Sequence, residues 1–122
     1  MDIFRKGKDK REECMKNKPI LHLNLKKKWF DMILSGEKKE EYRETKPYWD
    51  RIFFSGFGAI LIKEICYKPE DIIICFSNGY AKDRRQFYIK CNGLKRGFGL
   101  EKWGAEKDKI YYVLKLGSIV IP

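Results

Sequence analysis

The 122-residue sequence contains one histidine, four prolines and four cysteines that form no CxxC pair. Zinc sites need clustered Cys or His ligands, so scattered cysteines predict free thiols in a cytoplasmic protein and no metal. No apolar run approaches the roughly 18 residues that span a bilayer. No apolar stretch of a secretory signal follows the charged N-terminus. We therefore expect neither a membrane-spanning segment nor secretion.

Acidic residues are also few, with 17 Asp and Glu against 27 Lys and Arg and a net charge of +10. Residues 1–18 hold seven basic and four acidic side chains and few apolar ones. They predict a basic, flexible tail ahead of one folded domain at 19–122, which carries the other +7. A folded body with this excess of charge indicates an anionic partner, with nucleic acid first and an anionic membrane surface second.

Hydrophobic periodicity predicts an α+β fold. Period-two alternation predicts strands at 20–25, 86–91 and 110–116, and a continuous apolar run predicts a buried strand at 72–76. Residues 59–67 favour a strand more weakly, and residues 92–104 predict a Gly-rich loop. Helical spacing predicts a helix over 26–35, ended by Gly36 in a left-handed cap, and a second helix from Pro47. Trp29 and Trp49 lie on the apolar stripes of these helices, which predicts that both are core residues.

The two predicted helices come in one block rather than alternating with every strand, which argues against a doubly wound sheet. We therefore expect a small, mostly antiparallel β-barrel with the two helices packed at its side.

The segment SGEKKEEYR at 35–43 is the most informative for chemistry. Gly36 permits a sharp exit from the helix, which predicts Lys38 at the rim of the next extended segment. There, a period of two puts Glu41 and Arg43 on one face. A carboxylate held beside a cation can grip a phosphate or a base edge. The alternative is a solvated polar strand whose ion pairs contribute little.

Gly36, Lys38, Glu41 and Arg43 form the pattern G-x-K-x-x-E-x-R. With the phrases LHLNLKKKWFDMILSGEKKEEYRETKPYW, SNGYAKDRR and WGAEKDKIYYVLKLGSIV, it resembles the ASCH-domain family, a branch of the PUA-like superfamily. The likeness covers roughly residues 19–55 and 71–121. It implies a PUA-like barrel with a cleft beside the first helix, lined by the motif, and RNA or a modified nucleotide as the ligand.

The same resemblance implies a possible hydrolase. Some stand-alone members of the family are amidohydrolases of an N-acylated cytidine, and others are reported as ribonucleases. The amidohydrolases use a motif Lys, a Thr at the motif's Glu position and a distant Glu. Lys38 matches the Lys, Glu41 stands where the Thr should be, and Glu101 and Glu106 are candidates for the distant Glu. The Thr nucleophile is therefore missing from this chain.

Other candidates come from outside the motif, each with two interpretations. Asn78 and Tyr80 follow a buried strand, where they either bond and stack on a base or are turn residues only. The clusters 26–28 and 82–85, with Lys26, Lys28 and Arg84, either hold phosphates or are solvated. Trp103 either stacks on a base or folds back onto the core. His22 faces away from the apolar side of its strand, which predicts a surface position.

These observations predict an RNA- or nucleotide-binding monomer. Lys38 and Glu41 would bond a base edge, Arg43 and the basic clusters would hold phosphates, and Tyr80 or Trp103 would stack. The alternative is a hydrolase of an N-acylated nucleoside or of RNA, with Lys38 and Glu41 in proton transfer. A third interpretation, a protein-interaction domain, rests on fold analogy alone. We expect no cofactor, no metal and no membrane partner.

Overall fold

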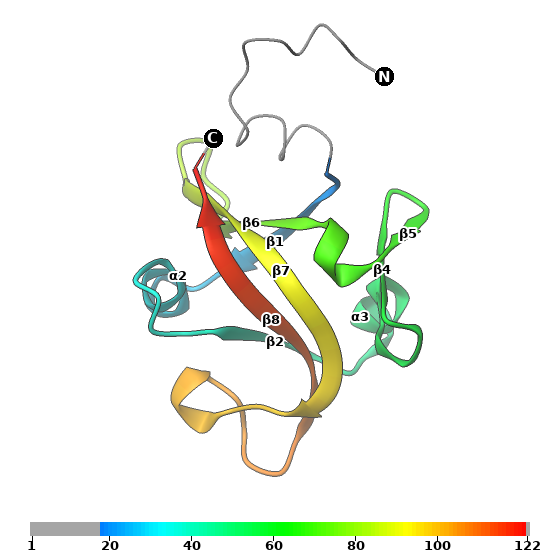
Figure 1. The fold of residues 1–122 in the computed structure, drawn as a ribbon. Coiled ribbons are helices and arrows are strands. Elements are labelled where there is room, and N and C mark those ends of the chain that lie inside the picture. Colours follow the sequence, from blue (N-terminus) through cyan, green and yellow to red (C-terminus); the bar gives the residue numbers. More distant parts are fainter. Residues whose placement is uncertain (1–17, 122) are drawn as a thin grey trace, which may run out of the picture.

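A curled five-stranded sheet dominates the computed structural model, which describes residues 18–121 (Figure 1). Its strand order is β1-β6-β7-β8-β2, with β1 and β6 parallel and every other pair antiparallel. The strands are β1 (Ile20–Leu25), β2 (Glu40–Glu44), β6 (Ile73–Asn78), β7 (Arg85–Phe98) and β8 (Ile110–Val120). The long strands β7 and β8 bend together across the molecule, so the sheet forms half of a barrel.

A second, smaller sheet lies beside the first. It is antiparallel and contains β3 (Phe53–Phe54), β4 (Ala59–Ile62) and β5 (Ile65–Tyr67). Lys63 and Glu64 make the turn between β4 and β5 with φ of 48° and 68°. Three short 3₁₀ helices connect elements elsewhere: η2 (Ser55–Phe57), η3 (Pro69–Asp71) and η4 (Glu101–Trp103).

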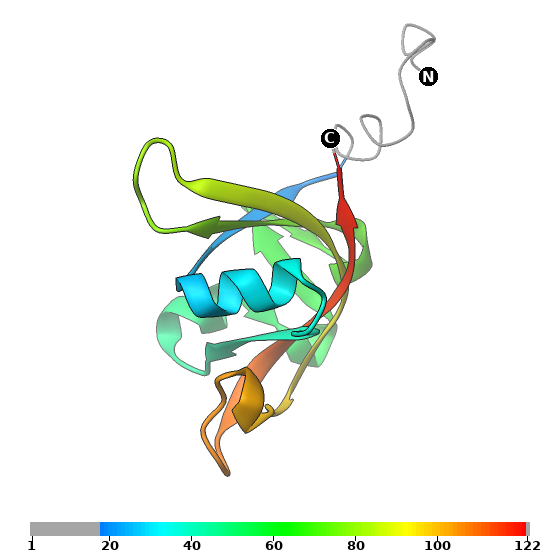
Figure 2. The same ribbon diagram turned by 90° about the vertical axis from the view of Figure 1, so that its left-hand side faces the viewer.

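Two α-helices, α2 (Lys27–Leu34) and α3 (Pro47–Ile52), both occur before the small sheet. Figure 2 shows α2 between the β6–β7 hairpin and β2. Its residues Phe30 and Ile33 are buried against the sheet. Gly36 follows the helix with φ of 87°, as the left-handed cap predicts. Pro47 occupies the first turn of α3, where the missing N–H costs nothing.

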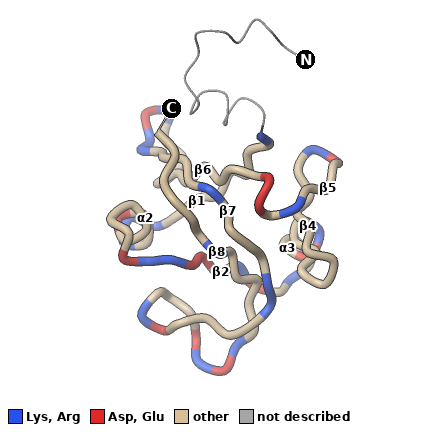
Figure 3. Tube along the Cα trace, viewed as in Figure 1, with Lys and Arg blue, Asp and Glu red and all other residues tan. Residues whose placement is uncertain are grey.

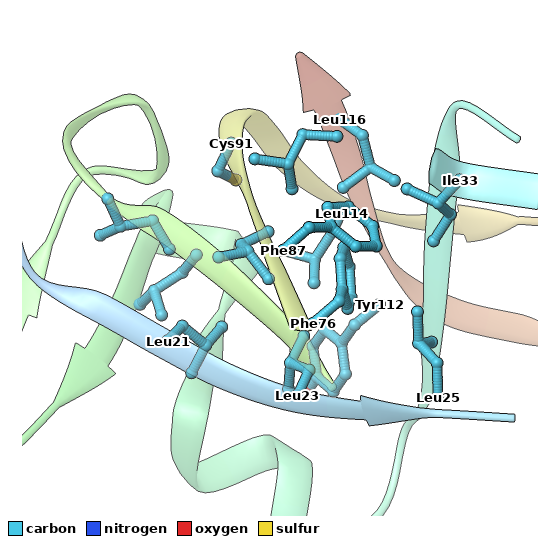
Figure 4. Close-up of a cluster of buried hydrophobic side chains, with 14 of the residues drawn as sticks. Leu21, Leu23, Leu25, Ile33, Phe76, Phe87, Cys91, Tyr112, Leu114 and Leu116 are labelled. Atoms are coloured by element: carbon cyan, nitrogen blue, oxygen red, sulfur yellow. The ribbon is translucent and has the colours of Figure 1, made fainter. Parts of the chain in front are cut away.

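The main core fills the concave side of the curled sheet. Leucines 21, 23 and 25 alternate inward from β1, and they meet Phe76 of β6, Phe87 of β7 and Leu114 of β8 (Figure 4). Phe87 contacts both Phe30 and Phe76, with ring centroids 4.9 and 5.7 Å apart. The period-two patterns in the sequence therefore record which side of each strand faces this core.

The α+β class, the two helices and the mostly antiparallel sheet are confirmed. The predicted loop at 92–104 is wrong in its first half, because β7 continues to Phe98 and pairs with β8 from Gly93 onward. Register shifts between Ile89 and Gly93 accommodate the bend, and the loop spans residues 99–109. Asn78 is the last residue of β6 rather than a turn residue. The predicted tail lies outside the described residues except for Lys18.

Among residues 18–121, no helix has the length and apolar character needed to cross a membrane.

The packing of the core predicts that two phenylalanines contribute very differently to the free energy of unfolding. Phe76 is 0% exposed, whereas Phe57 is 90% exposed. Phe76→Ala should lower the free energy of unfolding by about 3–5 kcal/mol, since it removes a buried ring and leaves a cavity. Phe57→Ala should change it by less than about 0.5 kcal/mol. Urea unfolding measures both, and equal losses would contradict this core.

Candidate ligand-binding cleft

A cleft with a volume of about 550 Å³ lies beside the N-terminal end of α2. Four parts of the chain line it: the end of β1 with the start of α2, strand β2, helix α3, and the segment from loop 99–109 into β8. Its lining residues are Asn24, Leu25, Lys26, Trp29, Glu41, Tyr42, Arg43, Glu44, Trp49, Trp103, Gly104, Glu106, Lys109 and Tyr111. Cavities of roughly 300–1,000 Å³ hold small ligands in proteins.

A chain of three charged side chains forms the floor of the cleft. Lys38 Nζ donates to Glu41 Oε1 at 2.8 Å, and Arg43 NH2 donates to Glu41 Oε2 at 2.7 Å. The side chains of Lys38, Glu41 and Arg43 are 1%, 8% and 15% exposed. Two largely buried cations therefore share one carboxylate, and its orientation is fixed from both sides.

The exit from α2 explains why Lys38 is buried. The Gly36 N–H donates to Ile33 O at 3.0 Å, and the Lys38 N–H donates back to Met32 O at 2.9 Å. Lys38 Nζ also donates to Glu40 O at 2.5 Å and lies 5.0 Å from the centroid of the Tyr42 ring. The expectation that Lys38 stands at the rim is therefore wrong, because the left-handed cap turns the chain inward.

Burial also changes the acid–base behaviour of Lys38. Loss of hydration disfavours an ammonium ion, and this effect lowers the pKa of Lys38 below its usual value even though the Glu41 carboxylate favours the charged form.

Arg43 connects the floor to the opposite edge of the sheet. Its NH2 group donates to Asn24 O of β1 at 2.8 Å, and its guanidinium carbon lies 5.0 Å from the centroid of the Trp49 ring. Its buried Nε atom has no hydrogen-bond partner among residues 18–121. The guanidinium therefore lies against an indole ring, and its buried Nε remains an unused donor.

Three tryptophans, Trp29, Trp49 and Trp103, contribute to the walls of the cleft. The loop that carries Trp103 is anchored at two points. The Leu100 N–H donates to Tyr42 Oη at 2.9 Å, and the Glu106 N–H donates to Tyr111 Oη at 2.9 Å. Gly104 has a φ of 102°, and a Cβ atom there would lie 2.9 Å from the Trp29 ring. The loop thus lies directly against α2.

The charged residues at the mouth differ in whether they are already paired. Lys109 Nζ bonds Glu106 Oε2 at 3.0 Å and Glu44 Oε2 at 3.3 Å. These two carboxylates raise the pKa of Lys109. Lys26, on the α2 side, makes no ion pair with any residue of 18–121. Among residues 18–121, the unpaired cation that lines the mouth is Lys26, on the α2 side.

The structure brings some predicted site residues together and not others. Lys26, Glu41, Arg43 and Trp103 line the cleft, and Lys38 lies directly behind Glu41. Of the two candidates for a distant glutamate, Glu106 lines the cleft and Glu101 does not.

Four predicted residues do not line the cleft: Lys28, Asn78, Tyr80 and Arg84. Asn78 Nδ2 donates to Leu25 O at 3.1 Å, so it ties two strand ends together. Arg84 donates to Ala81 O within its own turn, and Tyr80 is 88% exposed there. Lys28 lies over the Trp29 ring, 4.7 Å from its centroid. His22 is exposed on β1, as predicted.

The sequence reasoning missed Trp29 and Trp49 as cleft residues. Both pack against the core, as predicted, but both are only partly buried and also line the cleft. A helical stripe identifies a side chain that faces inward, and it does not distinguish the centre of a core from its edge. The available signal was their proximity in sequence to the motif on either side.

No group of three His, Cys, Asp or Glu side chains within residues 18–121 is arranged to hold a metal ion. The chain matches no protein-family model, and no curated protein and no solved structure matches it significantly.

The burial of Lys38 predicts an early deprotonation. Its ammonium group should lose its proton at a lower pH than the lysines of the urea-unfolded chain. The unfolded chain keeps the Lys38 proton up to about pH 10.5, so the contribution of Lys38 to the free energy of unfolding should rise with pH just below that value. Titration of the ¹³Cε and ¹⁵Nζ chemical shifts measures the pH at which the Lys38 ammonium group loses its proton. A midpoint for Lys38 in the folded protein at or above that of the unfolded chain would contradict it.

The sharing of the Glu41 carboxylate predicts that two substitutions lower the free energy of unfolding by different amounts. Glu41→Gln leaves the cations of Lys38 and Arg43 buried together without an anion, which should cost about 3–5 kcal/mol of unfolding free energy. Lys38→Met keeps the Glu41–Arg43 pair and should cost clearly less. Urea unfolding compares them, with exposed Glu101→Gln as the control that should change little. A Glu41→Gln loss no larger than that of Lys38→Met would be the contrary result.

Proposed function

We propose that this chain is an RNA- or nucleotide-binding protein of the ASCH, PUA-like type, whose cleft takes one nucleotide. The observation that carries the proposal is a cleft walled by three tryptophans over a fixed Glu41–Arg43 pair. The position of the cleft beside α2, with Glu41 and Arg43 of the motif in its lining, agrees with what the resemblance implies.

The walls suit a nucleobase. Indole faces stack on any base, and each such contact contributes about 1–3 kcal/mol. Both oxygens of Glu41 already accept one bond, but a carboxylate has about four acceptor positions. Glu41 can therefore also accept from an amino or imino N–H on a base edge, and its fixed orientation would select among bases.

The phosphate would lie toward α2. Lys109 is already held by two carboxylates, whereas Lys26 is unpaired among the described residues and the partly exposed guanidinium of Arg43 lines the cleft. A guanidinium and an ammonium on one side of the cleft are suited to phosphate oxygens. The base would then lie between the indoles, with the phosphate on the Lys26 side.

A hydrolase is the second candidate, favoured by the lowered pKa of Lys38 and by Glu106 in the cleft. A general base must reach the proton it removes, directly or through one water. The Lys38 side chain is 1% exposed, and Glu41 stands between it and the cleft. Binding is therefore the better supported function.

Binding should appear in the tryptophan signals. Titration of the ¹⁵N-labelled protein with AMP, CMP, GMP and UMP should shift indole N–H resonances of Trp29, Trp49 and Trp103. Trp103→Ala should weaken the binding of the best nucleotide by about 10-fold or more, since one stacking contact is lost. Phe57→Ala, which removes an exposed aromatic ring outside the cleft, should leave the affinity unchanged.

Absence of indole shifts with every nucleotide and with single-stranded RNA would overturn the proposal, as would equal losses in the two variants. Incubation with an N-acylated cytidine and with RNA tests the second candidate. Turnover that Lys38→Met abolishes would establish a hydrolase instead.

A further inference from the structure

The β6–β7 hairpin brings a second basic segment next to the start of α2. Asn24 Nδ2 donates to Gly79 O at 2.6 Å, and Arg85 NH1 bonds Asp31 Oδ1 of α2 at 3.0 Å. Figure 2 shows the tip of this hairpin above the first turn of α2, with loop 99–109 further along the same side of the molecule. Segments about 55 residues apart in sequence therefore form one surface.

We call this surface the basic shoulder and define it by its Lys and Arg residues, which are Lys26, Lys27, Lys28, Lys82, Arg84 and Arg85. Figure 3 colours the Lys and Arg positions along the trace blue. Two acidic residues, Asp31 and Asp83, belong to the same segments. Asp31 is already shared by Lys27 and Arg85. The remaining four cations make no ion pair with residues 18–121, so the shoulder has a local excess of positive charge.

The shoulder is continuous with the cleft. Lys26 belongs to both, and Asn24 lines the cleft while it holds Gly79 at the base of the hairpin tip. Tyr80 follows Gly79 and is 88% exposed. An anionic ligand that leaves the cleft past Lys26 therefore meets further cations and an exposed aromatic ring.

From this arrangement we propose that the ligand is a single-stranded polynucleotide rather than a free nucleotide. The inference rests on the proposed function of the cleft. One phosphate needs only Lys26 and Arg43, whereas the three further unpaired cations of the shoulder, which lie beyond the cleft, fit a chain of phosphates. A base can enter the cleft only when it is unstacked and unpaired, which favours a single strand over a duplex. Tyr80 then stacks on a neighbouring base.

The experiment compares UMP with a fluorescent oligouridylate of about eight nucleotides. At low salt the oligonucleotide should bind the protein at least about 10-fold more tightly than UMP. Its log–log salt slope should be near −3 if about four phosphates are neutralised. The variant Lys82→Ala/Arg84→Ala should reduce the size of this slope by about 1.4 and leave UMP binding unchanged.

The matched control is Lys68→Ala/Lys90→Ala, which removes the same charge from exposed residues outside the shoulder. This control should bind the oligonucleotide as the unmodified protein does.

Two kinds of failure are distinguishable. If UMP shifts the cleft indoles but the oligonucleotide binds no more tightly, or if both double variants lose affinity equally, the shoulder is not a strand path and only this inference fails. If neither ligand shifts any indole, the proposed function fails and this inference with it. Binding to phosphatidylserine vesicles in place of the oligonucleotide, lost in Lys82→Ala/Arg84→Ala, would also overturn it in favour of a membrane surface.

Discussion

The hydrogen bond from Arg43 to Asn24 O is the contact on which the cleft depends. The five-stranded sheet has the order β1-β6-β7-β8-β2, so Asn24 and Arg43 belong to its two edge strands. No backbone ladder joins these edges, and the half-barrel is bridged here by a side chain instead. An arginine in this position must be neutralised, since an unpaired buried cation costs several kcal/mol. Glu41 supplies the charge, and Lys38 holds Glu41 from behind. The gap between the edge strands β1 and β2, which we call the seam, is therefore where the side chains of Lys38, Glu41 and Arg43 lie together.

The same seam explains why the cleft is organised before any ligand arrives. Loop 99–109 crosses its end, and the contacts of Leu100 with Tyr42 and of Gly104 with Trp29 hold that loop in place. Tyr42 also donates to Glu40, which bonds Lys115 of β8. Contacts within the chain therefore hold both the aromatic walls and the charged floor of the cleft. Such preorganisation reduces the entropy that a ligand loses on binding.

The sequence predicted most of this fold, because alternation and helical spacing follow directly from which side of an element faces the core. It failed where the outcome depended on tertiary contacts. Residues 92–98 contain two glycines and read as a loop, yet pairing with β8 extends β7 through them. In the sequence, Lys38 has the features of a surface lysine. Neither the composition nor the hydrophobic periodicity reveals that the turn at Gly36 directs its side chain onto Glu41. The pairing of Glu41 with Arg43 was predictable, because period two is enough to place two residues on one face.

The sequence gives the number of positive charges, and the structure gives their positions and ion-pair partners. The folded body carries an excess of seven positive charges in sequence, which indicates an anionic partner without locating it. The structure separates several of these cations by their surroundings. Lys38 and Arg43 are largely buried and serve the cleft floor. Lys27, Arg85, Lys109 and Lys115 are engaged by carboxylates. Lys26, Lys28, Lys82 and Arg84 stay unpaired among residues 18–121 and share one surface beside the cleft. These four cations adjoin the cleft, so their position beside it, rather than the number of cations in the sequence, supports the proposal of an anionic ligand.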